Sequence, residues 1–75
     1  MIRYKNLSGD SGVYAFETGS DFIKVQFKGG ATYLYNYIVT GINHIETMKR
    51  MAINGRGLSA YISTYVKNKY ASKLR

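Results

Sequence analysis

The sequence predicts an α+β fold, in which a three-stranded antiparallel β-meander is followed by two C-terminal α-helices packed on one face. Residues 13–37 are rich in β-branched and aromatic residues, and they alternate in part between apolar and polar positions, as half-buried strands do. Residues 41–70 instead repeat apolar residues every three or four positions, which is the period of an amphipathic helix. The length of 75 residues suits one domain spanning residues 1–75.

Turn-forming residues separate the three expected strands. The first strand covers residues 13–17 and ends at a turn cluster over residues 18–21. The second covers residues 22–28, with apolar side chains at alternate positions. A two-residue hairpin turn, Gly29-Gly30, then leads into the third strand over residues 31–37, which carries tyrosine at positions 33, 35 and 37.

Two apolar stripes define the expected helices. The stripe of the first helix consists of Ile42, Ile45, Met48 and Ala52. That of the second consists of Leu58, Tyr61, Ile62, Tyr65 and Val66. Thr40 is the expected N-cap of the first helix and Gly55 its stop, while the second helix leaves the core near Lys67. Residues 1–8 and 71–75 are expected to be mobile ends.

Composition excludes several classes of function. The absence of Cys removes disulfides, thiol nucleophiles and Cys-based zinc sites, and one His with four acids leaves no room for a His-rich metal centre. His44, the only imidazole, has no serine or acid at a spacing that suggests a triad. We therefore expect no catalytic residue, no metal and no cofactor, and hence no enzyme.

The chain also lacks segments that direct proteins to membranes. No apolar run approaches the roughly 20 residues of a membrane span. The N-terminal residues lack the apolar stretch of a secretory signal. We therefore expect a cytoplasmic protein.

A core drawn from only 75 residues needs added stabilisation. The large side chains of eight Tyr and three Phe can supply it. Formation of a homodimer is the other possible source of stability.

Positive charge is concentrated in the C-terminal part of the chain. The net charge is +7, yet four cations and four acids balance over residues 1–46, and no acid follows Glu46. Because Lys and Arg attract phosphate groups, this pattern predicts contact with nucleic acid or a nucleotide. The side chains expected to contact phosphate are Lys49, Arg50, Arg56, Lys67, Lys69 and Lys73. The alternatives are a merely solvated basic surface and a basic helix lying on an anionic membrane, although the core needs that helix's apolar face.

Two further features would complete a phosphate-binding site. Tyr35 and Tyr37 offer flat rings on which bases stack, unless the register of the strands turns the tyrosine face into the core. Gly55 and Gly57 bracket Arg56 and would form a backbone nest for an anion. The alternative for this glycine pair is a helix C-cap followed by a flexible link.

The same order of elements resembles the KTSC domain, a family named for the C-terminal domain of some lysyl-tRNA synthetases that also occurs as free-standing small proteins. The resemblance rests on the segment VQFKGG, on the Tyr-x-Tyr pair Tyr33 and Tyr35, and on the basic helical segment that follows. It covers the chain from about Ser8 to Tyr70. It implies this fold and an association with nucleic-acid proteins, and it implies no established activity.

Two hypotheses about function follow. The first is a small non-enzymatic binding module for nucleic acid or another phosphate-bearing ligand such as a nucleotide. The alternative is a protein-interaction or oligomerising module, for example a phage or mobile-element protein that docks on an acidic host protein. Composition rich in Lys, Asn, Ile and Tyr suits an AT-rich source. Salt separates the hypotheses, because polyanion binding weakens steeply as salt rises and an apolar interface does not.

Overall fold

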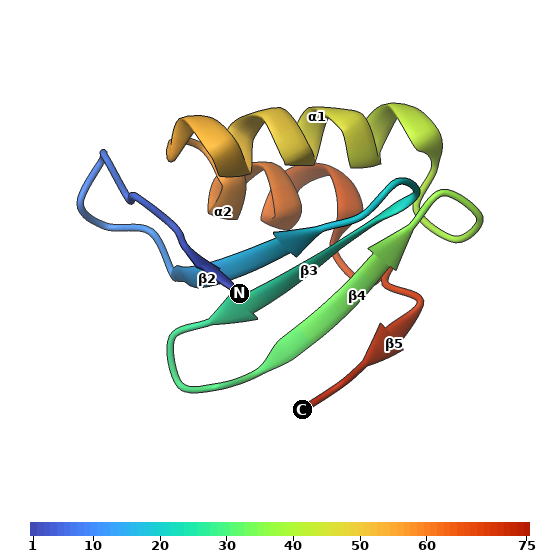
Figure 1. Ribbon diagram of the computed structural model, residues 1–75, viewed down its shortest axis with the longest axis horizontal. Helices are drawn as coiled ribbons and strands as arrows, with labels where there is room; N and C mark the ends of the chain where they lie inside the picture. The colour runs from blue at the N-terminus through green and yellow to red at the C-terminus, as the bar shows by residue number, and fades with distance from the viewer.

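A five-stranded antiparallel sheet covered by helices on one face forms the protein (Figure 1). The computed structural model describes residues 1–75. The strands lie in the sheet in chain order and are β1 (Ile2–Arg3), β2 (Val13–Thr18), β3 (Phe22–Phe27), β4 (Thr32–Asn36) and β5 (Ser72–Lys73). The helices are α1 (Ile42–Asn54), α2 (Leu58–Tyr61) and η1 (Ile62–Val66), the last a π-helical turn that continues α2. The predicted α+β class is confirmed.

The prediction of three strands is wrong, because each end of the chain adds a short edge strand. β1 pairs with β2 through Ile2 opposite Phe16, and β5 pairs with β4 through Tyr33 opposite Lys73. A two-residue strand is too short to produce an alternating pattern that can be recognised in a sequence. Segments expected to be mobile ends therefore contribute to the sheet.

The N-terminal segment is also anchored by a side chain. Tyr4 follows β1 directly and is buried in the core. Its hydroxyl accepts a hydrogen bond of 3.2 Å from the backbone N–H of Leu58, the first residue of α2. The start of the chain is thereby joined to the start of the second helix.

The register of β3 and β4 decides which face of the sheet is buried. Ile23 lies opposite Tyr35, and Val25 lies opposite Tyr33, so these side chains point to the same face. Helices α1, α2 and η1 cover this face and bury Ile45, Met48, Ala52, Leu58, Ile62 and Val66 against it. The alternative in which the tyrosine face belongs to the core is therefore the one that the structure adopts.

The first helix ends as predicted but begins differently. Gly55 has a left-handed backbone with φ of 77°, and it caps the C-terminus of α1. The N-cap position belongs to Gly41, whereas the predicted cap, Thr40, donates its hydroxyl to the carbonyl oxygen of Lys69 at 2.5 Å. The expected helix cap therefore joins the turn between β4 and α1 to the segment after η1.

The second helix starts at Leu58 and ends at Val66, as the sequence predicts. One member of the predicted apolar stripe is misplaced, because Tyr65 is 58% exposed. The π-helical hydrogen bond from Lys67 N–H to Ile62 C=O, 2.7 Å long, widens the last turn beyond 3.6 residues. A stripe extrapolated at the α-helical period therefore fails within this turn.

Candidate functional site

A cleft lined by four aromatic rings lies between the sheet and the end of η1. Its volume is about 270 Å³. The rings are those of Phe27, Tyr33, Tyr35 and Tyr70. The other lining residues are Ile62, Ser63, Lys67 and Asn68. We call this site the aromatic cleft.

Tyr33 is the centre of the aromatic cluster. Its ring centroid lies 4.7 Å from that of Tyr70, 5.8 Å from that of Phe27 and 6.4 Å from that of Tyr35. Tyr33 and Tyr70 are each half-buried, so part of each ring faces solvent. These two rings therefore offer apolar surface that a flat ligand can cover.

Tyr35 forms the buried base of the cluster. Its residue is only 2% exposed, and burial, with smaller contributions from Tyr33 and Tyr70, raises the pKa of its phenol to about 12. A ring this enclosed has no free face, so the prediction that Tyr35 stacks on a base is wrong. The register that aligns it with Ile23 is the physical reason.

The break after η1 brings Tyr70 to the cleft. Lys67 adopts a positive φ of 40°, which ends the helix and turns the chain. Ala71 then donates a backbone hydrogen bond of 2.7 Å to Leu34 in β4, and this bond holds the neighbouring Tyr70 beside the sheet. The sequence pattern does not reveal this turn, so it gives no reason to place Tyr70 beside Tyr33.

Two of the predicted cations lie at the cleft. Lys67 is one of its lining residues, and the Lys73 ammonium lies 5.9 Å from the centroid of the Tyr33 ring. Both side chains belong to exposed residues, and neither forms an ion pair. Lys69 lies between them in the chain and is exposed as well. The aromatic cleft thus combines ring surface with unpaired positive charge.

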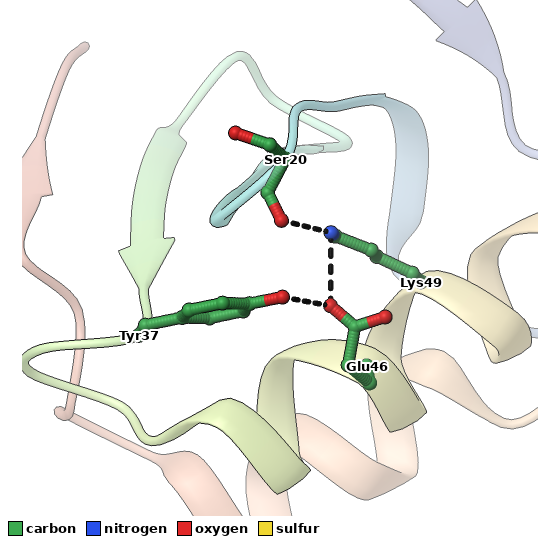
Figure 2. Close-up of polar contacts among 4 residues, drawn as sticks. All are labelled: Ser20, Tyr37, Glu46 and Lys49. Atoms are coloured by element: carbon green, nitrogen blue, oxygen red, sulfur yellow. Dashed lines mark hydrogen bonds and ion pairs between the residues drawn. The ribbon is translucent and has the colours of Figure 1, made fainter.

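Lys49 and Tyr37 lie elsewhere, in a polar network that joins α1 to the sheet (Figure 2). The Tyr37 hydroxyl donates to Glu46 Oε2 at 2.5 Å, and the Lys49 ammonium donates to the same oxygen at 3.0 Å. Lys49 also donates to the carbonyl of Ser20 at 2.9 Å. Both side chains have fixed partners, so the predicted roles of Lys49 in phosphate binding and of Tyr37 in stacking are not supported.

This network shifts the pKa values of Glu46 and Tyr37 in opposite directions. The hydrogen bond from Tyr37 and then the one from Lys49 lower the pKa of Glu46 below its ordinary value, since both favour the carboxylate. The same bond to Glu46 raises the pKa of the Tyr37 phenol, because it favours the form that keeps its proton. Glu46 is thus held charged and partly neutralises Lys49.

Arg50 and Arg56 do not line the aromatic cleft. Arg56 lies two residues before the start of α2 and Lys67 follows the last residue of η1, so a nine-residue helical segment roughly 13 Å long lies between them. Gly55, next to Arg56, packs against Lys5 from the N-terminal segment. The six predicted phosphate contacts therefore do not form one patch.

The predicted anion nest at Gly55 and Gly57 is not supported, because the backbone N–H groups of Gly55 and Arg56 already have acceptors within the chain. The N–H of Gly55 donates to Met51 at 2.9 Å and to Ala52 at 3.2 Å. That of Arg56 donates to Met51 at 3.3 Å. The alternative, a helix C-cap, is the observed structure.

Three aromatic residues of the cleft, Phe27, Tyr33 and Tyr70, were not among the predicted site residues. Tyr33 could have been predicted from the sequence, since it belongs to the same series of alternating tyrosines as Tyr35. Phe27 could also have been predicted, since it lies on the apolar side of its strand. Nothing in the local sequence marks Tyr70, which depends on the backbone turn at Lys67.

The chain has no group of three or more His, Cys, Asp or Glu side chains that could hold a metal ion. Its helices are all too short and too polar to cross a lipid bilayer. No protein-family model matches the chain, and neither a curated protein nor a solved structure matches it.

Proposed function

We propose that the protein is a small non-enzymatic binding module for a nucleobase with its attached phosphate, and that the aromatic cleft is the site. The ligand is a nucleotide or an unpaired base of single-stranded nucleic acid. The observation that carries the proposal is the meeting of the Tyr33–Tyr70 pair with Lys67 and Lys73 at one cleft. A cytoplasmic location would expose the protein to both ligands, and the resemblance to the KTSC domain agrees with such a role.

The size of the cleft favours one flat ring system. Its volume of about 270 Å³ lies just below the roughly 300–1,000 Å³ of pockets for drug-sized ligands. Stacking of a base on an aromatic side chain contributes about 1–3 kcal/mol. The half-buried rings of Tyr33 and Tyr70 provide that surface, while Ser63 and Asn68 offer polar groups to the base edge.

The cations provide the second part of the interaction. A phosphate attached to the stacked base lies within reach of the flexible ammonium groups of Lys67 and Lys73 at the cleft. No carboxylate forms an ion pair with either lysine, so no internal contact must be broken. In a duplex both faces of a base are already stacked, so this site favours single strands.

The test is fluorescence anisotropy with labelled single-stranded and double-stranded oligonucleotides, measured at several salt concentrations. The test variant is Lys67→Glu/Lys73→Glu, and the matched control is Arg50→Glu/Arg56→Glu, which makes the same charge change outside the cleft. We expect tighter binding of single strands and a loss of at least tenfold in the cleft variant. We also expect its log–log salt slope to fall by about 1.4, or roughly 0.7 per phosphate contact.

A second arm separates the two sources of the ligand. Thermal melting with added mononucleotides should raise the melting temperature if a free nucleotide suffices, and leave it unchanged if the chain requires a longer strand. The variant Tyr70→Leu removes the stacking ring and should weaken binding of either ligand. Equal losses in the cleft variant and in the Arg50/Arg56 control would contradict the proposal, because they would indicate attraction by net charge alone.

A further inference from the structure

Three exposed aliphatic residues cluster where β4 leads into α1. Ile38 is 91% exposed, Ile42 54% and Val39 48%. Single exposed apolar residues are common, but three within five positions form a patch of the kind that marks an interface. We call these three residues the turn surface.

The turn surface is presented by a well-ordered turn. Val39 N–H donates to the Asn36 side-chain oxygen at 2.9 Å, and Thr40 N–H donates to the Asn36 carbonyl at 2.9 Å. The next N–H, that of Gly41, donates to the Tyr37 carbonyl at 3.1 Å. Consecutive backbone bonds fix the turn, so an interface here would lose little backbone entropy.

Two residues of opposite charge contact this turn through their backbone carbonyls. On the side of β3, Tyr37 N–H donates to the backbone carbonyl of Asp21 at 3.1 Å. On the side of β5, the Thr40 hydroxyl donates to the backbone carbonyl of Lys69 at 2.5 Å. Asp21 and Lys69 are both exposed, and neither forms an ion pair. The apolar turn therefore lies between an acidic residue and a basic residue whose side chains extend into solvent without an ion pair.

An apolar centre with an acid on one side and a cation on the other is complementary to itself. A two-fold axis through such a centre places the acid of each copy opposite the cation of its partner. We propose that two copies of this chain associate through the turn surface, with Ile38 at the centre and Asp21 opposite Lys69 of the partner subunit. An acidic protein partner matches this surface less closely, because it would face Asp21 as well as Lys69.

The net charge of +7 does not prevent this association. Charges separated by more than about 8 Å are largely screened at physiological ionic strength. Arg50 and Arg56 follow the turn surface by eight or more residues, so they contribute little repulsion between two copies. Ion pairs at an exposed rim add little affinity, but they set the orientation of the partners. The apolar centre supplies the affinity, and the charges select the two-fold arrangement.

The test is the oligomeric state, measured by sedimentation equilibrium over a range of protein concentrations. We expect wild type to be in equilibrium between the 8.5 kDa chain and a species of twice that mass. Ile38→Asp should abolish the dimer and leave the fold intact, since the residue is almost fully exposed. The matched control, Ile53→Asp, changes another exposed isoleucine, near the end of α1, and should leave the dimer unchanged.

Charge reversal tests the orientation. Asp21→Lys and Lys69→Asp should each raise the dimer dissociation constant about tenfold, because each substitution occurs twice in a two-fold dimer. The double variant should restore it to near the wild-type value. Wild type that stays monomeric at the highest soluble concentration would overturn the proposal, as would a double variant no tighter than the single ones. Oligonucleotide binding is measured separately on the Ile38→Asp variant, so failure of the dimer does not decide the proposed function.

Discussion

Removal of the Tyr4 hydroxyl group is the best test of how the N-terminal segment contributes to stability. It accepts the backbone N–H of Leu58 at 3.2 Å in a buried environment. The substitution Tyr4→Phe keeps the ring that packs in the core and removes only this oxygen. It leaves the first N–H of α2 without an acceptor at a point that water does not reach.

The expected cost follows from that unsatisfied donor. A buried N–H that loses its partner costs about 1–3 kcal/mol of unfolding free energy. At roughly 0.05–0.15 kcal/mol per residue, a domain of 75 residues has only about 4–11 kcal/mol in total. Each kcal/mol lowers the melting temperature of a domain of this size by about 4–8 °C. We therefore expect a fall of several degrees from one missing atom.

The assay is urea unfolding followed by circular dichroism, with Tyr14→Phe as the matched control because Tyr14 is exposed and its hydroxyl has no partner within the chain. Tyr4→Phe should lower the urea midpoint without changing the m-value, since the native contacts stay the same. The Leu58 amide should also exchange its hydrogen faster. A change of less than about 0.5 kcal/mol, equal to that of the control, would mean that the Tyr4 hydroxyl contributes nothing to stability, because surface substitutions have effects of that size.

Three further predictions concern titration and packing. Because the folded pKa of Tyr35 is raised to about 12, wild type should lose roughly 2–3 kcal/mol of stability as pH rises from 10 through 12; Tyr35→Phe should lack most of this loss, as alkaline unfolding of the two proteins would show. Because the folded pKa of Glu46 is lowered, its stabilising contribution is complete above the ordinary value of 4.5 and disappears as pH falls through the folded value. Glu46→Gln should therefore flatten acid unfolding below pH 4.5, and an unchanged profile would contradict the role of the network. Gly55→Ala should cost about 1–3 kcal/mol in thermal melts, since a Cβ at φ of 77° would lie 2.5 Å from Lys5 Cβ; a neutral result would mean that the N-terminal segment yields easily.

Much of the fold could be predicted from local patterns. The alternation around Ile23 and Val25 predicted a strand, and the turn after it followed from Gly29-Gly30, because both signals depend only on neighbouring residues. The first helix and its end at Gly55 followed in the same way. The short edge strands could not be predicted, since two residues carry no period and their pairing depends on distant strands.

The candidate site was less predictable than the fold. The C-terminal concentration of charge correctly drew attention to Lys67 and Lys73, but it also included Lys49, which an acid three positions earlier in the chain engages. Whether a cation is free depends on which carboxylates the fold brings near it. Composition counts charges and does not contain that information.

Local patterns and composition were enough to predict the α+β class, the three longer strands, the two helical segments and the excess of positive charge in the last 29 residues. Three other features depend on how distant segments pack: Tyr35 is buried, Tyr70 lies against Tyr33, and Arg56 and Lys67 lie at opposite ends of one helical segment. The two sets of features differ in how far apart along the chain the interacting residues lie. Periodicity and turn chemistry act between residues a few positions apart, whereas register, backbone turns such as that at Lys67, and the packing of distant segments determine which side chains meet.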